Sequence, residues 1–201
     1  MSKDTVVKKS QKDWAEYYKI TKNKPPSKLL IKALKYVKNK KRAIDIGGGA
    51  LKDTRYLLSK GFDVTVIDSS ELMAKEAKKI KSGKLRYVIE HFDKFNFPEN
   101  TFDIALTMYS LPFNAPDTFD NVFENIKKSI VEDGIFCGQL FGVRDEWSNK
   151  PNMTFHTKRQ IAKLFLGMEI IYFKEEEIDG KTANGAPKHW HVFHFIAKRI
   201  I

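Results

Sequence analysis

Cysteine and long apolar runs are both scarce in this sequence. A single cysteine, Cys137, occurs in 201 residues, which excludes a disulfide scaffold and fits a reducing compartment. No apolar run approaches the roughly 18 residues that a membrane span needs, and the polar residues 1–10 lack the apolar stretch of a signal peptide. Apolar residues make up 42% of the chain, enough for one globular domain with a core. We therefore expect a soluble cytoplasmic protein.

Positive charge is in excess only near the N-terminus. Residues 1–42 carry 14 basic and three acidic side chains, whereas residues 43–201 carry 22 of each sign. Lysines alternate there with apolar residues at helical spacing, namely Leu29, Leu30, Ala33, Leu34 and Val37. This pattern predicts an amphipathic helix with a solvated lysine face, while a site for a polyanion such as nucleic acid stays open as an alternative. We expect residues 1–41 to form a basic helical segment that packs on the core of residues 42–201.

Strand and helix signals alternate from residue 42 onward. Short apolar, β-branched runs predict strands at Arg42–Ile46, Phe62–Asp68, Leu85–Ile89, Phe102–Met108 and Ile135–Phe141. Helical spacing of apolar residues fills three of the gaps between them, and the last of these helices is expected to reach Asp133-Gly134. The alternation predicts an α/β fold of the Rossmann-like, doubly wound type with a mostly parallel sheet.

The final third of the chain has a different pattern. Residues 142–153 are expected to form an irregular loop, and Thr157 to Gln160 resemble a capping box at the start of a short helix. Two further strands, Met168 to about Glu177 and Trp190 to Arg199, are separated by turn residues. We expect them to pair as a C-terminal antiparallel hairpin, which completes a seven-stranded sheet.

A glycine-rich turn and an acidic residue occupy the positions where a nucleoside would bind such a sheet. Gly47, Gly48 and Gly49 follow the first strand, so that backbone amides and a helix N-terminus can approach a ligand closely. Asp68 ends the second strand, 23 residues after Asp45, where a carboxylate can accept hydrogen bonds from both ribose hydroxyls. The spacing of the two features predicts a bound nucleoside.

The glycine turn does not fit a dinucleotide fingerprint, because Lys52 stands where the third glycine is needed. It resembles instead the D-x-G-x-G-x-G motif of class I S-adenosylmethionine-dependent methyltransferases. Asp45, Gly47 and Gly49 match that motif, and Leu51 replaces its third glycine.

Further segments extend this resemblance over roughly residues 14 to 199. Phe97 to Asp103 is similar to the turn that enters strand four in that family, and Tyr109 to Phe113 to the segment that follows it. Together with the tail Lys188-His-Trp-His191, these segments resemble small bacterial methyltransferases of the tellurite-resistance-like (TehB-like) group. The resemblance implies S-adenosyl-L-methionine as cofactor, and a thiol, chalcogen or metalloid as the small-molecule acceptor.

The resemblance also implies roles for individual residues. Asp68 would bind the ribose, Ser69 and Met73 would border the adenine, and Phe92 would lie beside it with Glu90 or Asp93 as polar partner. Thr107 to Tyr109 would flank the sulfonium, which an electron-rich ring attracts by cation–π electrostatics. The expected cofactor-binding residues are Tyr18, Asp45, Gly47, Gly48, Gly49, Asp68, Ser69, Met73, Phe92, Asp93 and Thr107.

Candidate catalytic residues are Tyr109 and three histidines of the tail, His156, His189 and His191. Methyl transfer from a sulfonium releases a neutral thioether, so a base is needed only for acceptors that are not already nucleophilic. The histidines could frame an acceptor pocket or could be structural, and no metal site is expected from them. Trp14, Tyr17 and Tyr18 share one helical face, which could cover the cofactor or simply pack on the core.

Three functional classes remain open at this point. A small-molecule methyltransferase is favoured, because Cys137 lies within an apolar strand and Ser110-Leu-Pro-Phe113 lacks the amide of nucleic-acid amine methyltransferases. An RNA or DNA methyltransferase that uses the basic N-terminal segment would bind nucleic acid with steep salt dependence. A non-catalytic cofactor-binding scaffold is the third class, and the oligomeric state is left open.

Overall fold

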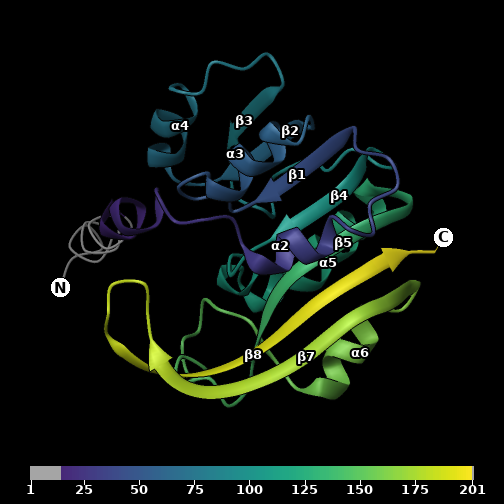
Figure 1. Ribbon diagram of the computed structural model, residues 1–201. Coiled ribbons are helices and arrows are strands. Elements are labelled where there is room, and N and C mark those ends of the chain that lie inside the picture. The colour runs from purple at the N-terminus through teal and green to yellow at the C-terminus, as the bar shows by residue number, and fades with distance from the viewer. Residues whose placement is uncertain (1–14, 201) are drawn as a thin grey trace.

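One continuous sheet of eight strands organises the part of the chain that the computed structural model describes, residues 15–200 (Figure 1). The strand order is β3-β2-β1-β4-β5-β8-β7, and β6 pairs with β5 beside this path. The strands are β1 (Arg42–Ile46), β2 (Asp63–Asp68), β3 (Leu85–Ile89), β4 (Phe102–Thr107), β5 (Ile130–Gly142), β6 (Phe155–His156), β7 (Met168–Lys181) and β8 (Pro187–Arg199).

The pairing directions confirm the predicted fold class. Strands β1 to β6 are mutually parallel where they pair, whereas β8 runs antiparallel to both β5 and β7. The C-terminal hairpin is longer than expected, since its turn is confined to residues 182–186. The two-residue strand β6 was not expected from the sequence.

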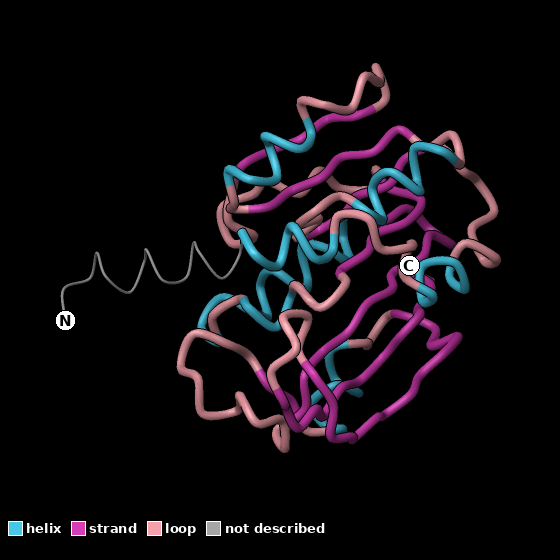
Figure 2. The backbone as a smooth tube through the Cα atoms, turned by 60° about the vertical axis from the view of Figure 1, so that its left-hand side comes forward, coloured by secondary structure: helices cyan, strands magenta, loops and turns pink. Residues whose placement is uncertain are grey.

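Helices cover both faces of the sheet (Figure 2). They are α2 (Lys28–Ala33), α3 (Lys52–Ser59), α4 (Glu71–Ala77), the 3-10 helix η1 (Leu111–Phe113), α5 (Pro116–Ser129) and α6 (Lys158–Leu164), preceded by helical residues 15–21. Side chains of a strand alternate between its two faces, so Ile44 and Ile46 of β1 join one core cluster with α5, and Ala43 joins another with α2.

The expected end of helix α5 was four residues too late. The helix ends at Ser129, and β5 begins at once, because the β-branched Ile130 pairs with Phe102 of β4. Asp133 then adopts a left-handed backbone (φ 63°) at an irregularity in the β4–β5 pairing. The Asp-Gly sequence that indicated a helix end therefore marks a bend within the strand.

The described part of the basic N-terminal segment contains a short amphipathic helix, α2, which ends at Ala33 and does not continue to Val37 as expected. Leu30 and Ala33 of α2 are fully buried, whereas Lys28 is exposed and Lys32 is half-buried. Lys32 lies 3.2 Å above the ring of Tyr172, and Lys38 pairs with Asp133 at 2.7 Å. Trp14 and the preceding residues lie outside the described part of the chain. Within residues 15–200, no helix combines the length and apolar character that crossing a membrane requires.

The carboxyl ends of β1 and β4 point toward helical residues 15–21, while the β7–β8 hairpin curves along the other side (Figure 1).

In the strand after the hairpin turn, Lys188 is completely buried and pairs with the equally buried Asp145 at 2.5 Å. Its ammonium lies 3.7 Å from the ring centroid of Trp190 and 4.4 Å from that of Trp147. This ion pair holds the loop after β5 on the hairpin.

We predict that Asp145→Asn destabilises the protein by about 3 to 5 kcal/mol, because it leaves a buried ammonium without its counter-charge. The measurement is urea unfolding followed by circular dichroism. Asp133→Asn, which breaks an exposed ion pair, is the matched control and should have a far smaller effect. Equal midpoints for the two variants would contradict a structural role for the buried pair.

Candidate functional site

A cavity of about 1030 Å³ lies at the carboxyl ends of the parallel strands, where connections leave β1 for opposite sides of the sheet. It extends from the loop after β3, across the glycine turn after β1, to the loops after β4 and β5. Its walls include Ala15, Tyr17, Tyr18, Gly47, Gly49, Asp68, Ser69, Ser70, Glu71, Leu72, Lys75, His91, Phe92, Met108, Tyr109, Ser110, Phe113, Asn114, Asn152 and Met153.

Gly47 is needed at the centre of this cavity for steric reasons. Its backbone has φ 73°, and its amide donates to the carbonyl of Ile67 at 2.8 Å. A Cβ atom added there would overlap with Cβ of Ser110 and lie 3.2 Å from the ring of Phe92. The Ser110 hydroxyl in turn donates to the carbonyl of Ile46. Loops after β1 and β4 are thereby packed directly against each other.

Leu51, which replaces a glycine of the motif, adopts the conformation that favours glycine. Its φ is 63°, and it caps α3 from a left-handed backbone. Its side chain is fully buried in a cluster with Tyr18, Val66 and Met73. Burial of a leucine side chain contributes about 1.5 to 3 kcal/mol, enough to offset the roughly 1 to 2 kcal/mol of the left-handed backbone.

Asp68 lies at the cavity wall and orders the glycine turn. Its two carboxylate oxygens accept hydrogen bonds from the amides of Gly49 and Ser70, both at 2.9 Å. Burial raises the pKa of Asp68, and these two hydrogen bonds oppose the shift. Each oxygen retains capacity to accept another hydrogen bond, so the carboxylate can receive ligand hydroxyls without losing its backbone contacts.

Asp45 lies beneath the glycine turn and does not border the large cavity. It accepts a hydrogen bond from the Thr54 hydroxyl at 2.6 Å, and burial together with the nearby charge of Asp53 raises its pKa to about 7. With Gly48 it lines a second cavity of about 30 Å³ behind the turn. The structure therefore places both residues behind the loop.

The β2–β3 side of the cavity brings together some of the expected residues and not others. Ser69 and Phe92 line it, but Met73 is fully buried, because Leu72 and Lys75 occupy the side of α4 that faces the cavity. Asp93 lies outside the wall and pairs with Lys94 at 3.6 Å. The histidine before Phe92, His91, lines the cavity and was not expected.

The segment after β4 forms the opposite wall. Thr107 is fully buried and accepts a hydrogen bond from the amide of Leu111 at 3.0 Å, so it shapes the turn from below. Tyr109 projects at the wall from a left-handed backbone with φ 58°. Burial, and secondarily the charge of Glu176, raises the pKa of Tyr109 to about 12. At neutral pH its hydroxyl is protonated and can donate a hydrogen bond but cannot act as a base.

Aromatic rings extend this wall toward the loop after β5. Phe113 lies 6.3 Å from Phe141 and 6.2 Å from Trp147, measured between ring centroids. Sequence reasoning missed Asn114, Asn152 and Met153, which complete this end. Asn114 follows directly after the recognised Ser-Leu-Pro-Phe segment, whereas no local signal marks residues 152 and 153, which long-range packing brings to the site.

The structure does not place the three tail histidines at the cavity. His156 is buried against Phe119, with 4.7 Å between ring centroids, and burial lowers its pKa to about 4. His191 is buried beside Glu175, whose carboxylate lies 3.0 Å from its Nε2.

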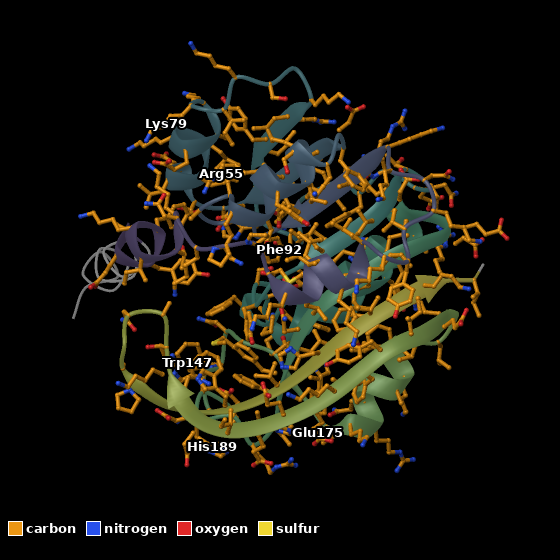
Figure 3. The ribbon with its side chains drawn as sticks, in the orientation of Figure 1. Arg55, Lys79, Phe92, Trp147, Glu175 and His189 are labelled. Atoms are coloured by element: carbon orange, nitrogen blue, oxygen red, sulfur yellow. The ribbon has the colours of Figure 1, made fainter. Side chains whose placement is uncertain are left out.

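His189 is the third of these histidines and is exposed. Its Nδ1 lies 2.7 Å from Asp179. Figure 3 shows His189 and Glu175 along the outer side of the hairpin, away from Phe92. Alternation along β8 explains the outcome, since Trp190 and His194 take the inward face beside Tyr109.

Comparison with known proteins relates the glycine turn and its neighbouring strands to one family. Residues 43–134 match the family model described as "Methyltransferase domain", and this stretch runs from β1 into the first residues of β5 and includes the glycine turn. No curated protein matches the chain. The match over residues 43–134, a little under half of the chain, and the fold together support a class I S-adenosylmethionine-dependent methyltransferase.

Solved structures with the same fold include several methyltransferases. A SAM-dependent methyltransferase from Methanosarcina mazei is 19% identical with a TM-score of 0.64, covering 84% of this chain and 97% of that chain. TehB from Haemophilus influenzae is 15% identical with a TM-score of 0.72, and the match covers 85% of this chain but 61% of TehB. 1,6-didemethyltoxoflavin-N1-methyltransferase from Burkholderia thailandensis is 18% identical with a TM-score of 0.66, and the match covers 100% of this chain and 92% of that chain.

The residues at the cavity fit S-adenosylmethionine, the cofactor of this class. The glycine turn offers a cradle that a Cβ would fill at Gly47, and Asp68 offers free acceptor capacity. The hydroxyl of Tyr18 is buried at the cavity wall and, among residues 15–200, has no partner within hydrogen-bond distance. An unpaired buried hydroxyl is costly, so a polar ligand at this position would satisfy it.

We predict that Gly47→Ala abolishes or strongly weakens binding of S-adenosylhomocysteine, since its methyl group requires Ser110 and Phe92 to move. Gly61→Ala is the matched control, because Gly61 also has a positive φ (91°) but open space around its Cβ position. Calorimetric titration measures the affinity for S-adenosylhomocysteine. Urea unfolding measures the loss of stability that both variants share, because each places an alanine at a positive φ. Normal affinity in a folded Gly47→Ala protein would contradict the close packing described for the turn.

Proposed function

We propose that this methyltransferase acts on a small-molecule acceptor, bound in the part of the cavity between Tyr109, Phe113 and the loop after β5. The observation that carries the proposal is the shape of the site. One cavity continues from the glycine turn into an end walled by aromatic rings, two amide side chains and Met153. Concave, largely apolar sites with a few polar groups are typical of small-molecule binding.

The cofactor would occupy the rest of the same cavity, with its sulfonium reaching Tyr109, where the cofactor and acceptor parts meet. Asp68 would accept hydrogen bonds from the ribose hydroxyls, and the adenine would lie near Ser69, Leu72 and Phe92 on the β2–β3 side. Its methionine portion would cross the turn at Gly47 and Gly49. This orientation is supported by the strand order, which places the β2 and β3 loops on one side of the turn and the β4 loop on the other.

The acceptor end favours a nucleophile that needs little deprotonation. Among the described residues that line this end, Tyr109 is the ionisable one, and its raised pKa keeps it protonated at neutral pH. Aromatic and thioether side chains suit polarisable groups. We infer an acceptor that arrives already nucleophilic, namely a thiol that enters as its thiolate, a chalcogen or a metalloid, with a heterocyclic nitrogen as an alternative. The Burkholderia enzyme, which shares the fold, is named as an N1-methyltransferase of 1,6-didemethyltoxoflavin.

Nucleic acid is a less favoured acceptor on the same observations. The described basic residues of the N-terminal segment do not converge on the cavity, and Lys32 and Lys38 have partners elsewhere on the surface. A nucleic-acid enzyme would bind RNA or DNA with an affinity that falls steeply with salt concentration.

The experiment that tests the proposal is calorimetric titration with S-adenosylmethionine, S-adenosylhomocysteine and NAD, followed by transfer of a labelled methyl group to thiols, selenite, tellurite and RNA. Binding of both sulfur nucleosides but not NAD, with label on a small acceptor, is expected. Label on RNA alone would replace the small-molecule proposal. Binding without transfer to any acceptor tested would favour the non-catalytic scaffold.

We predict that Asp68→Ala weakens S-adenosylhomocysteine binding by about 1 to 3 kcal/mol, because the ribose hydroxyls lose their acceptor. Asp63→Ala is the matched control, since Asp63 begins the same strand but is exposed and pairs weakly with Lys84 at 3.7 Å. Both affinities can be measured by calorimetry. Unchanged affinity in a folded Asp68→Ala protein would rule out this placement of the ribose.

A further inference from the structure

The backbone of Tyr109 is held in a conformation that residues with side chains rarely adopt. Its φ of 58° places it just beyond the end of β4, where its side chain lines the cavity. A non-glycine residue in this region persists when its surroundings fix it. The surroundings that fix Tyr109 reach across three neighbouring strands.

A chain of side-chain hydrogen bonds starts at the Tyr109 amide. The amide donates to Oε1 of Gln139 on β5 at 3.2 Å. Nε2 of Gln139 lies 3.4 Å from Nδ1 of His194 on β8, and Nε2 of His194 lies 3.3 Å from Oε2 of Glu176 on β7. Gln139 and His194 are direct partners in the β5–β8 pairing, so the register of the sheet places these two side chains next to each other.

The chemistry of these groups fixes the direction of every hydrogen bond. A backbone amide can only donate, so Gln139 presents its oxygen to Tyr109 and its NH₂ group to His194. His194 must then accept at Nδ1 and carry its proton on Nε2, where Glu176 accepts it. The complete chain therefore exists only with a neutral imidazole in one tautomer.

We propose that His194 is a positioning residue, which holds Tyr109 at the cofactor-binding wall through Gln139 and does so only while its imidazole is neutral. This inference rests on the proposed function, because it takes the wall at Tyr109 to border the cofactor. His194 does not line the cavity, and its effect on binding acts through Gln139 and the Tyr109 backbone.

Protonation of His194 disrupts the chain. A hydrogen on Nδ1 would face the NH₂ group of Gln139, and rotation of the Gln139 amide would only move the clash to the Tyr109 amide. The charged groups around His194 are Glu176, which favours its protonation, and Lys174, which opposes it, while the ring of Tyr109 lies 6.4 Å away. Burial is the largest influence and lowers the pKa of His194, so the imidazole is neutral at neutral pH.

Two variants separate hydrogen bonding from ring packing. His194→Asn places a side-chain oxygen near the position of Nδ1, keeps an acceptor for Gln139 and cannot titrate. His194→Phe keeps a ring beside Tyr109 but has no acceptor. His189→Asn, on the exposed outer face of the same strand, is the control. Calorimetry with S-adenosylhomocysteine from pH 5 to 8 gives the affinities, and urea unfolding tests the fold of each variant.

We expect His194→Phe to lose at least about tenfold in affinity at pH 7.5, whereas His194→Asn and His189→Asn stay within about threefold of the wild type. Wild-type affinity should fall on acidification, and His194→Asn should remove the part of this fall that His194 causes. Normal affinity in His194→Phe with a loss in His194→Asn would show a packing role and overturn the proposal.

Nuclear magnetic resonance of the ligand-free protein tests the chain separately from the proposed function. The His194 ring nitrogens should report a proton on Nε2, and the Tyr109 amide signal should move with the titration of His194. The proposed hydrogen-bond chain would be overturned if the Tyr109 amide signal did not change during the titration of His194, or if neutral His194 carried its proton on Nδ1. Wild-type protein that shows the linked titration but does not bind S-adenosylhomocysteine would instead overturn the cofactor placement, and with it the functional part of the inference.

Discussion

The contact between Gly47 and Ser110 is the constraint on which the site depends. It joins the loops after two adjacent strands, β1 and β4. The backbone of Gly47 lies so close to Ser110 that a Cβ atom would not fit, and the Ser110 hydroxyl donates a hydrogen bond to the carbonyl of Ile46. The β2 side is tied to the same turn by Asp68, which binds the Gly49 amide. Three strand ends are thereby fixed relative to one another before any ligand is considered. Because these strand ends are fixed, the residues of the glycine turn are enough to indicate the class of cofactor. The acceptor end is built from parts of the chain that lie farther apart in the sequence.

Local sequence signals predicted the strands and turns that form this part of the site. Alternating apolar runs located the strands, and the spacing from Asp45 to Asp68 placed two groups at adjacent strand ends, because parallel strands present their carboxyl ends at one edge. Sequence reasoning was less successful where side-chain direction depends on helical register or packing. Met73 is one residue removed from the cavity-facing Leu72, and Asp45 and Gly48 lie behind the turn. The bend at Asp133 was mistaken for a helix end, since Asp-Gly serves both purposes.

The acceptor end shows why the remaining residues could not be predicted. Asn152 and Met153 reach the cavity because the adjacent Thr154 donates hydrogen bonds to the carbonyls of Pro112 and Asn114. The buried pair of Asp145 and Lys188 holds the start of the same loop on a strand more than 30 residues later. The tail histidines attracted attention as titratable groups, yet the alternation of β8 directs His189 and His191 to the face that is turned away from the cavity, where His191 is buried. His194, on the inner face, is the histidine that connects to the site, through Gln139. Its importance depends on the pairing of β8 with β5, which lies far from it in the sequence, as well as with its hairpin partner β7.

The central claim is that the cofactor binds across the turn at Gly47 with its ribose on Asp68. The most direct test is a crystal structure of the protein with S-adenosylhomocysteine. The account predicts both ribose hydroxyls within hydrogen-bond distance of the Asp68 carboxylate, the sulfur near Met108 and Tyr109, and the adenine beside Phe92. A bound nucleoside whose ribose lies away from Asp68, or whose sulfur points toward the β3 loop, would contradict it.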